Sequence, residues 1–211
     1  MAVQKEKAAR ITALLKKAYP EGLCSLEARD PFQLLAATRL SAQCTDARVN
    51  LVTPALFARF PTVQAMAAAE QAEVEEIIRP CGFFHTKAGD LIGMAQAICR
   101  NHGGTVPGSM EELTALPGVG RKTANLILGD VFALPAVVTD THVIRITNLL
   151  GLASGKQPEK VEQQLRDCLD PAESNNFCHR CVLHGRAVCV ARRPNCPACV
   201  LREECDAGRA S

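Results

Sequence analysis

The sequence predicts an all-α protein, and three observations support this fold class. Apolar residues recur with helical spacing, cap and breaker residues punctuate the chain, and no segment of strand length alternates between apolar and polar residues. The 211 residues are 47% hydrophobic and 22% charged, which is typical of a folded globular protein and excludes disorder as the main state. No apolar run approaches the ~20 residues that a membrane span needs.

The helices are expected in an unbroken series, and local signals mark several of their ends. Asp30 and Pro31 are an N-cap and first-turn pair, Gly103 is a stop signal, and Ser109 begins a capping-box pattern that starts a helix. Pro54 either interrupts a helix or begins a second one, and the sequence leaves both open. The expected helices cover 5–19, 31–40, 46–60, 63–69, 71–79, 87–100, 121–132, 141–150, 158–169 and 174–188.

Charge and cysteine content narrow the class of protein. The net charge is only +2, so binding to nucleic acid depends on where the charges lie and not on a basic field over the whole surface. Seven Phe, one Tyr and no Trp argue against a single-strand binder built on stacked rings. Eleven cysteines without a secretory signal indicate a reducing compartment, hence a cytoplasmic protein, associated with the nucleoid if the source is bacterial.

Four cysteines near the C-terminus predict a metal centre. Cys189, Cys196, Cys199 and Cys205 have the spacing C-x6-C-x2-C-x5-C in an irregular, proline-rich stretch. Zinc sites prefer two short C-x2–4-C steps, and only one is present, so a [4Fe–4S] cluster is favoured over zinc. Arg192 and Arg193 in this stretch either neutralise thiolate charge or present a phosphate-binding face, and both can hold together. A second C-x2-C pair, Cys178 and Cys181, is on a predicted helix and is interpreted as core packing.

A glycine turn between two predicted helices forms the second motif. The string Leu-Pro-Gly-Val-Gly-Arg-Lys-Thr-Ala spans 116–124, with Gly118 and Gly120 allowing close approach of the backbone. The helix that follows begins with free N–H groups, and its dipole favours a phosphate there. The pattern predicts a helix–hairpin–helix that grips the DNA backbone without reading sequence.

These motifs, taken in order, resemble a known family. The strings at 40–43 (LSAQ), 82–88 (GFFHTKA), 116–124, 138–143 (VTDTHV) and 184–186 (HGR), with the cysteine quartet, resemble the endonuclease III family of the helix–hairpin–helix DNA glycosylases. The resemblance implies a bifunctional glycosylase and abasic-site lyase of base-excision repair. It also implies two lobes, a helical barrel at 24–134 and a cluster domain of 1–23 plus 135–211, with DNA in the groove between them.

The resemblance assigns the catalytic roles to Lys122 and Asp140. The Lys122 amine attacks C1′ of the damaged nucleotide and expels the base, so that a Schiff base forms. β-elimination from this Schiff base then nicks the strand. The attack requires an unprotonated amine, so the pKa of Lys122 must be lowered. Asp140 stabilises positive charge on the sugar and assists proton transfer, although it also fits an N-cap. Without the resemblance, Lys122 is interpreted as an ordinary solvated lysine.

Other residues are expected to open and hold the duplex. Gln43 matches the residue that fills the gap left by the extruded nucleotide, and Phe83 matches a wedge that is often Leu, so the opposite-base preference is expected to differ. The alternative for Gln43 is an ordinary polar loop residue, and the alternative for Phe83 is an aromatic residue of the core. Further expected DNA contacts are Leu116, Gly118, Gly120, Arg121, Arg192 and Arg193, and weaker pocket candidates, each also explained by caps or local hydrogen bonds, are Ser41, Asp46 and His142.

The expected partner is double-stranded DNA with damaged pyrimidines or abasic sites, bound by a monomer without membrane contact. Two alternatives remain. An adenine-specific mismatch glycosylase shares the cluster and hairpin but lacks the lysine and has an extra C-terminal domain; Lys122, and a chain that ends six residues after Cys205, argue against it. A non-catalytic iron–sulfur or zinc DNA-binding module needs no lysine–aspartate pair.

Overall fold

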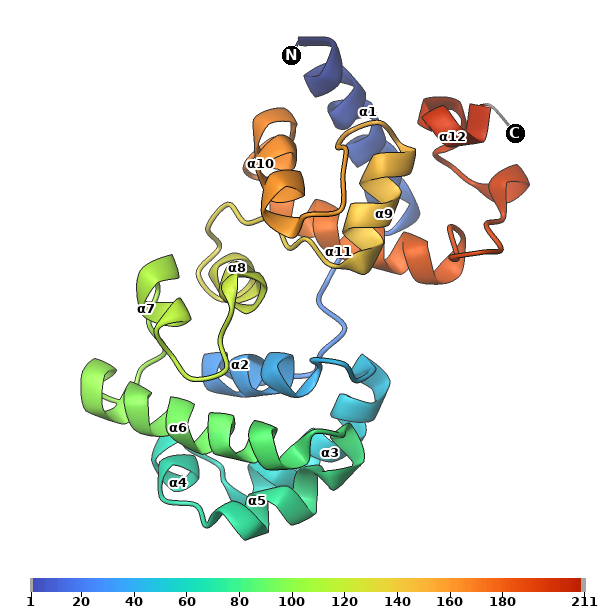
Figure 1. The fold of residues 1–211 in the computed structure, drawn as a ribbon. Coiled ribbons are helices and arrows are strands. Elements are labelled where there is room, and N and C mark those ends of the chain that lie inside the picture. The colour runs from blue at the N-terminus through green and yellow to red at the C-terminus, as the bar shows by residue number, and fades with distance from the viewer. Residues whose placement is uncertain (1, 210–211) are drawn as a thin grey trace. The chain divides into compact units, whose positions relative to one another are not determined.

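The computed structural model describes residues 2–209, and it is helical throughout (Figure 1). No strand occurs within that range, which confirms the all-α prediction. The α-helices are α1 (Ala2–Ala18), α2 (Pro31–Leu40), α3 (Asp46–Arg59), α4 (Val63–Ala67), α5 (Gln71–Ile78), α6 (Phe84–His102), α7 (Met110–Thr114), α8 (Arg121–Asp130), α9 (Thr141–Leu149), α10 (Pro158–Cys168), α11 (Ser174–Ala187) and α12 (Asp206–Arg209). Three 3₁₀ turns, η1 (Arg79–Cys81), η2 (Cys196–Ala198) and η3 (Arg202–Glu204), complete the series.

The local cap signals act as the sequence predicts. The Asp30 carboxylate accepts the Gln33 N–H at 2.9 Å at the start of α2. Ser109 caps α7 by accepting the Glu112 N–H at 3.2 Å, while its hydroxyl donates to the Glu112 carboxylate at 2.6 Å. Gly103 ends α6 in the left-handed conformation, with φ at 59°.

Two helices differ from expectation. α3 runs continuously through Pro54, so no second helix begins there, and the N-cap is Thr45. Pro54 lacks the N–H that the Asn50 carbonyl would receive inside a helix. α6 begins at Phe84, earlier than the expected residue 87, because Phe83 in the left-handed conformation turns the chain directly into the helix.

The chain divides into two compact units. Ser25–Phe132 forms one, in which α6 packs against α4 and α5 and also contacts α2; its core includes the buried side chains of Leu35, Leu91 and Met94. The residues up to Cys24, together with those from Ala133 onward, form the other. There α11 packs against α1 and α9, around the buried side chains of Ile11 and Phe177. Within residues 2–209, no helix is both long and apolar enough to cross a membrane.

Candidate active site and cysteine centre

The hairpin between α7 and α8 is fixed to its own unit by its apolar residues and by one glycine. Leu116 and Val119 are buried, at 4% and 6% exposure. Gly118 has φ at 71°, and a Cβ there would lie 2.7 Å from Arg39 Nε and 2.8 Å from Asp90 Cβ. Only glycine therefore allows this close approach of the turn to α2 and α6.

An ion pair that the sequence analysis missed supports the turn. Arg39 on α2 donates to the Asp90 carboxylate on α6 from Nη2 at 2.6 Å and from Nε at 2.7 Å. Both side chains are mostly buried, at 16% and 23% exposure, so the pair is shielded from solvent by the hairpin above it. Residues 51 positions apart carry no local pattern that reveals such a pair.

The start of α8 presents the expected phosphate-binding features. Its N-cap is Gly120, which has no side chain to occupy the first-turn N–H groups. Arg121 and Lys122 follow in that turn, and both are exposed. The predicted nucleophile thus lies beside an N-terminus suited to a phosphate group.

Leu116 lies differently from what a DNA contact implies. Its side chain is in the interior, its N–H donates to the Leu113 carbonyl at 3.1 Å, and its own carbonyl accepts the Val119 N–H at 3.1 Å. Leu116 therefore builds the hairpin from within.

Asp140 is the N-cap of α9, in the unit that does not contain Lys122. Its Oδ1 accepts the Val143 N–H at 2.7 Å, and the residue is half-buried after the buried stretch 136–139. The cap holds the carboxylate in one orientation. His142, in the first turn of α9, is half-buried, and its buried Nδ1 atom has no hydrogen-bond partner in the described structure.

Backbone conformation singles out Gln43 and Phe83. Among residues 2–209, four residues other than glycine have positive φ: Gln43 (53°), Phe83 (48°), Ala133 (52°) and Arg192 (68°). Such conformations cost about 1–3 kcal/mol each and concentrate at functional sites. Three of these four residues are predicted DNA contacts, and Phe83 has 66% of its surface exposed. Its exposure excludes the alternative of a core aromatic.

The weaker pocket candidates make the local hydrogen bonds that the sequence allowed for. Ser41 is the C-cap of α2, and its hydroxyl donates to the Thr38 carbonyl at 2.9 Å. Asp46 lies in the first turn of α3, where it accepts a hydrogen bond from the Ser25 hydroxyl at 2.6 Å. Both belong to the same unit as Gln43.

The structure brings the four predicted cysteine ligands to one cavity. Cys189, Cys196, Cys199 and Cys205 all line a cavity of about 260 Å³ and are half-buried. Sulfur-directed donors surround it: Arg145 Nη1 lies 3.3 Å from Cys189 Sγ, and the Gly208 N–H lies 3.3 Å from Cys205 Sγ. Four sulfurs with outer-shell donors form a ligand set for zinc or an iron–sulfur cluster, so the residues fit such a group.

Cys178 and Cys181 behave as core residues. Both are buried, at 1% and 0% exposure, and burial raises the pKa of Cys178 to about 12. Protonated, enclosed thiols are poor metal ligands, in agreement with the interpretation as core packing.

A histidine that the sequence analysis gave no role supports the cysteine cavity. His184 Nε2 lies 3.4 Å from Cys199 Sγ, and its Nδ1 lies 3.1 Å from the Tyr19 hydroxyl. Burial, with a smaller effect of Arg145, lowers the pKa of His184, so the ring is neutral near pH 7. Its packing between Tyr19 and Cys199 orients the loop that carries the cysteine.

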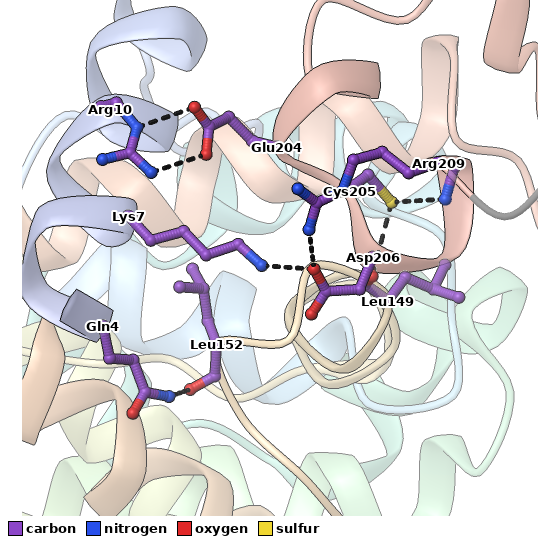
Figure 2. Close-up of polar contacts among 10 residues, drawn as sticks. Gln4, Lys7, Arg10, Leu149, Leu152, Glu204, Cys205, Asp206 and Arg209 are labelled. Atoms are coloured by element: carbon purple, nitrogen blue, oxygen red, sulfur yellow. Dashed lines mark hydrogen bonds and ion pairs between the residues drawn. The ribbon is translucent and has the colours of Figure 1, made fainter.

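The N-terminal helix binds the segment around the last cysteine (Figure 2). Lys7 Nζ donates to Asp206 at 2.7 Å, and Arg10 donates to Glu204 through two bonds of 2.7 and 3.1 Å. Gln4 adds a 2.8 Å bond to the Leu152 carbonyl. Cys205 therefore stands between two acidic residues that α1 holds.

Arg192 and Arg193 lie exposed in the loop before Cys196.

Comparison with known proteins agrees with these motifs. The profile of the HhH-GPD superfamily of base excision DNA repair proteins matches residues 36–171. Endonuclease III of Synechocystis sp. is 47% identical, over all of this chain and 97% of its own, and that of Escherichia coli K12 is 38% identical over 97% of each chain. A solved structure of a trapped endonuclease III–DNA covalent intermediate has a TM-score of 0.91 at 37% identity, and it covers 98% of this chain and 97% of its own.

The same likeness decides between the alternatives. Matches across the full chain to proteins named endonuclease III favour neither a mismatch glycosylase nor a non-catalytic module. The chain therefore belongs to the endonuclease III family of the HhH-GPD superfamily, and it is a base-excision DNA glycosylase with abasic-site lyase activity.

Proposed function

We propose that this enzyme removes oxidised pyrimidines from duplex DNA and cleaves the strand at the abasic site, with Lys122 as the nucleophile. The observation that carries the proposal is the exposed Lys122 amine in the first turn of α8, directly after a glycine hairpin whose helix has no side-chain cap. An amine at this position lies beside any phosphate that the start of α8 binds, and therefore near the sugar joined to that phosphate.

The proposed reaction proceeds through a covalent bond between Lys122 and C1′ of the damaged nucleotide. Its unprotonated Nζ attacks C1′, the C1′–N bond to the base breaks, and the base leaves with a proton. The sugar ring then opens as the amine forms an imine with C1′. Loss of a proton from C2′ expels the 3′ phosphate, which breaks the strand, and water hydrolyses the imine to regenerate the amine.

Asp140 is proposed as the carboxylate that assists this step. Cleavage of the glycosidic bond builds positive charge on the sugar, and a fixed anion stabilises it. The capping bond to the Val143 N–H holds the carboxylate rigid, and this supports the role.

Of the pocket candidates, Ser41, Asp46 and His142, the half-buried His142 is the one with an unpartnered buried polar atom.

Gln43 and Phe83 are proposed to enter the duplex when the damaged nucleotide is extruded. A base inside the stack is out of reach of the amine, so the stack must open and the gap must be filled. Exposure of both residues and their left-handed backbone support this. Gly118, Gly120 and Arg121 are proposed to hold one stretch of phosphates, and Arg192 and Arg193 another.

We also propose that the four cysteines hold a [4Fe–4S] cluster. The cluster would supply four iron–sulfur bonds that fix the loop, and the loop in turn presents Arg192 and Arg193 to phosphate. The single C-x2-C step supports a cluster over zinc, and the cavity that all four cysteines line supports a shared metal site. We further propose that the enzyme acts at the nucleoid, which is supported by its bacterial relatives and by DNA as the proposed substrate.

Borohydride trapping tests the proposal. The purified protein is mixed with a duplex that carries thymine glycol or an abasic site, and borohydride reduces any imine to a stable link. We expect a covalent complex with the wild type and with Lys160→Ala, a control on the exposed surface of α10, and none with Lys122→Ala. Equal trapping by Lys122→Ala would refute the assigned nucleophile. A colourless protein that contains zinc and no iron would refute the cluster.

A further inference from the structure

We propose that Lys87 is a positioning residue for nucleotide extrusion, because its buried ammonium ties the loop of Gln43 to the loop of Phe83. This inference rests on the proposed function of those two residues. Lys87 is buried, so its proposed role is to position other residues and not to contact the DNA.

The contacts of Lys87 join two separate segments. Its side chain is 1% exposed, although Lys is among the residues least often buried. Nζ donates to the Leu40 carbonyl at 2.8 Å and to the Cys81 carbonyl at 2.9 Å. Leu40 is the last residue of α2, three residues before Gln43, and Cys81 ends η1, two residues before Phe83. One cation thus holds the ends of two helical segments, where carbonyl oxygens lack partners within the helix.

The main chain adds a third contact at residue 87, the first i→i−4 bond of α6, which does not depend on the side chain. The Lys87 N–H donates to the Phe83 carbonyl at 3.0 Å. Phe83 is therefore held by its own carbonyl, and the turn before it is held through the Cys81 carbonyl. The whole turn from 81 to 83 is fixed to one residue of α6.

The energetic cost of this arrangement indicates that it does more than fill space. Burial of a charge is unfavourable unless strong hydrogen bonds compensate it, and an apolar side chain of similar length packs at lower cost. Burial lowers the pKa of Lys87; the thiols of Cys44 and Cys81 act in the opposite direction, and the Arg39 guanidinium adds to the lowering. A lysine kept at such a position supplies something that packing does not, which here is the pair of carbonyl contacts.

Strain in the two loops explains what the contacts do. Gln43 and Phe83 both have positive φ, and such residues persist only where the surroundings determine their conformation. Lys87 contacts the base of both loops, so it sets the spacing between the two side chains before DNA binds. A displacement of about 1 Å in such a preorganised arrangement costs about 100-fold in rate.

The test compares Lys87→Met with Leu91→Ala, a substitution of a fully buried residue one turn further along α6. Lys87→Met keeps the apolar stem and removes the three donors. Single-turnover rates are measured on a duplex with thymine glycol and on a single-stranded abasic oligonucleotide, which needs no extrusion from a stack. Thermal midpoints are recorded alongside, and 2-aminopurine next to the lesion reports unstacking.

We expect Lys87→Met to slow duplex excision by about tenfold or more and to reduce the 2-aminopurine signal, with single-strand cleavage within about twofold of the wild type. Leu91→Ala should lower the thermal midpoint without separating the two rates. Lys87→Gln, which keeps two N–H donors, should recover part of the duplex rate, and it replaces Lys87→Met as the test if the latter does not fold.

Two results would overturn the inference. One is an unchanged duplex rate in Lys87→Met, or in Lys87→Gln where that variant is the test. The other is a fall of both rates by the same factor, as in a destabilised control. A wild type that acts on neither substrate is a different outcome, because it contradicts the proposed function itself.

Discussion

Gly185 lies on the face of α11 that packs on α9, and its missing side chain sets how closely the two helices approach. A Cβ there would lie 2.5 Å from His142 Nδ1 and 3.0 Å from Ile146 Cδ1. Both atoms belong to side chains of α9, the helix that Asp140 caps, so a methyl group at residue 185 would press against that helix. One glycine therefore influences the position of the proposed catalytic carboxylate.

Gly185→Ala is expected to destabilise the protein by about 1–3 kcal/mol, because the added methyl group overpacks the helix contact. Differential scanning calorimetry measures the change as a lower thermal midpoint. Gly89→Ala, inside α6 with nothing within 4 Å of the new Cβ, is the matched control and should gain up to about 1 kcal/mol from helix propensity. A midpoint equal to the wild type in Gly185→Ala contradicts the overpacking argument.

The Glu173 carboxylate pairs with a buried arginine. It accepts hydrogen bonds from Lys16 at 2.6 Å and from Arg180 at 2.9 Å, and the Arg180 side chain is only 3% exposed. Lys16 first, and then Arg180, hold the pKa of Glu173 below its usual value of 4.5. A carboxyl whose folded pKa is lowered stabilises the fold above its unfolded pKa, and that stabilisation is lost as pH falls through the folded pKa.

Glu173→Gln should therefore lower the free energy of unfolding by about 1.5–3 kcal/mol at pH 7, and the difference from the wild type should shrink as the buffer is made acid. Urea unfolding at pH 7 and in steps below pH 4.5 measures this. Glu159→Gln, at an exposed position of α10, should change little at any pH. A difference for Glu173→Gln that stays constant down to acid pH is evidence against the charge-based explanation.

At the scale of elements, α1 and the cysteine segment stabilise one another although they lie at opposite ends of the chain. The Lys7–Asp206 pair joins residues 199 positions apart, and Arg10–Glu204 joins residues 194 apart. Lys7 and Asp206 are 16% and 50% exposed, so this pair alone contributes about 0–1 kcal/mol. Their effect lies in their location on both sides of Cys205.

The double variant Lys7→Met, Arg10→Met should therefore lose iron faster than the wild type when a chelator is present, with little change in helical content. Iron release followed by absorbance, alongside far-ultraviolet circular dichroism, separates loss of the cluster from unfolding. The double variant Lys5→Met, Lys17→Met, at two exposed positions of α1, is the control with the same loss of charge. Release at the wild-type rate in the double variant contradicts the role of α1 in holding the cysteine segment.

Local signals allowed most elements to be predicted, and non-local contacts explain what the sequence did not reveal. The caps at Asp30 and Ser109 act within three residues of themselves, so their effect can be read from neighbouring positions. The effect of Pro54 could not be predicted, because the surrounding packing, and not the local pattern, decides whether a helix continues through a proline. The early start of α6 depends on the left-handed backbone at Phe83, an unusual conformation for a bulky side chain.

The residues of the candidate site likewise fall into those that local motifs reveal and those that depend on non-local contacts. Lys122, Asp140 and the four cysteines stand in short motifs, so the sequence alone was enough to propose them. Lys87 also stands in a short motif, at 82–88, yet its proposed role depends on the carbonyl of Leu40, 47 residues away. Arg145, which donates to Cys189 from 44 residues away, gives no signal in the sequence either.

At the scale of the whole molecule, the residues proposed for the reaction are divided between the two units. The unit of Ser25–Phe132 contributes the hairpin, Lys122, Gln43 and Phe83, and the other unit contributes Asp140 and the cysteine loop. Membership of the endonuclease III family defines the class of reaction. Which amine forms the covalent link is the claim on which the rest depends.

Mass spectrometry of the borohydride-trapped complex tests that claim most directly. The reduced complex is digested with a protease and a nuclease, and the peptide that carries the sugar remnant is sequenced. We expect a single modified residue, Lys122, within the peptide that begins α8. A remnant on any other amine, with Lys122 unmodified, contradicts this expectation.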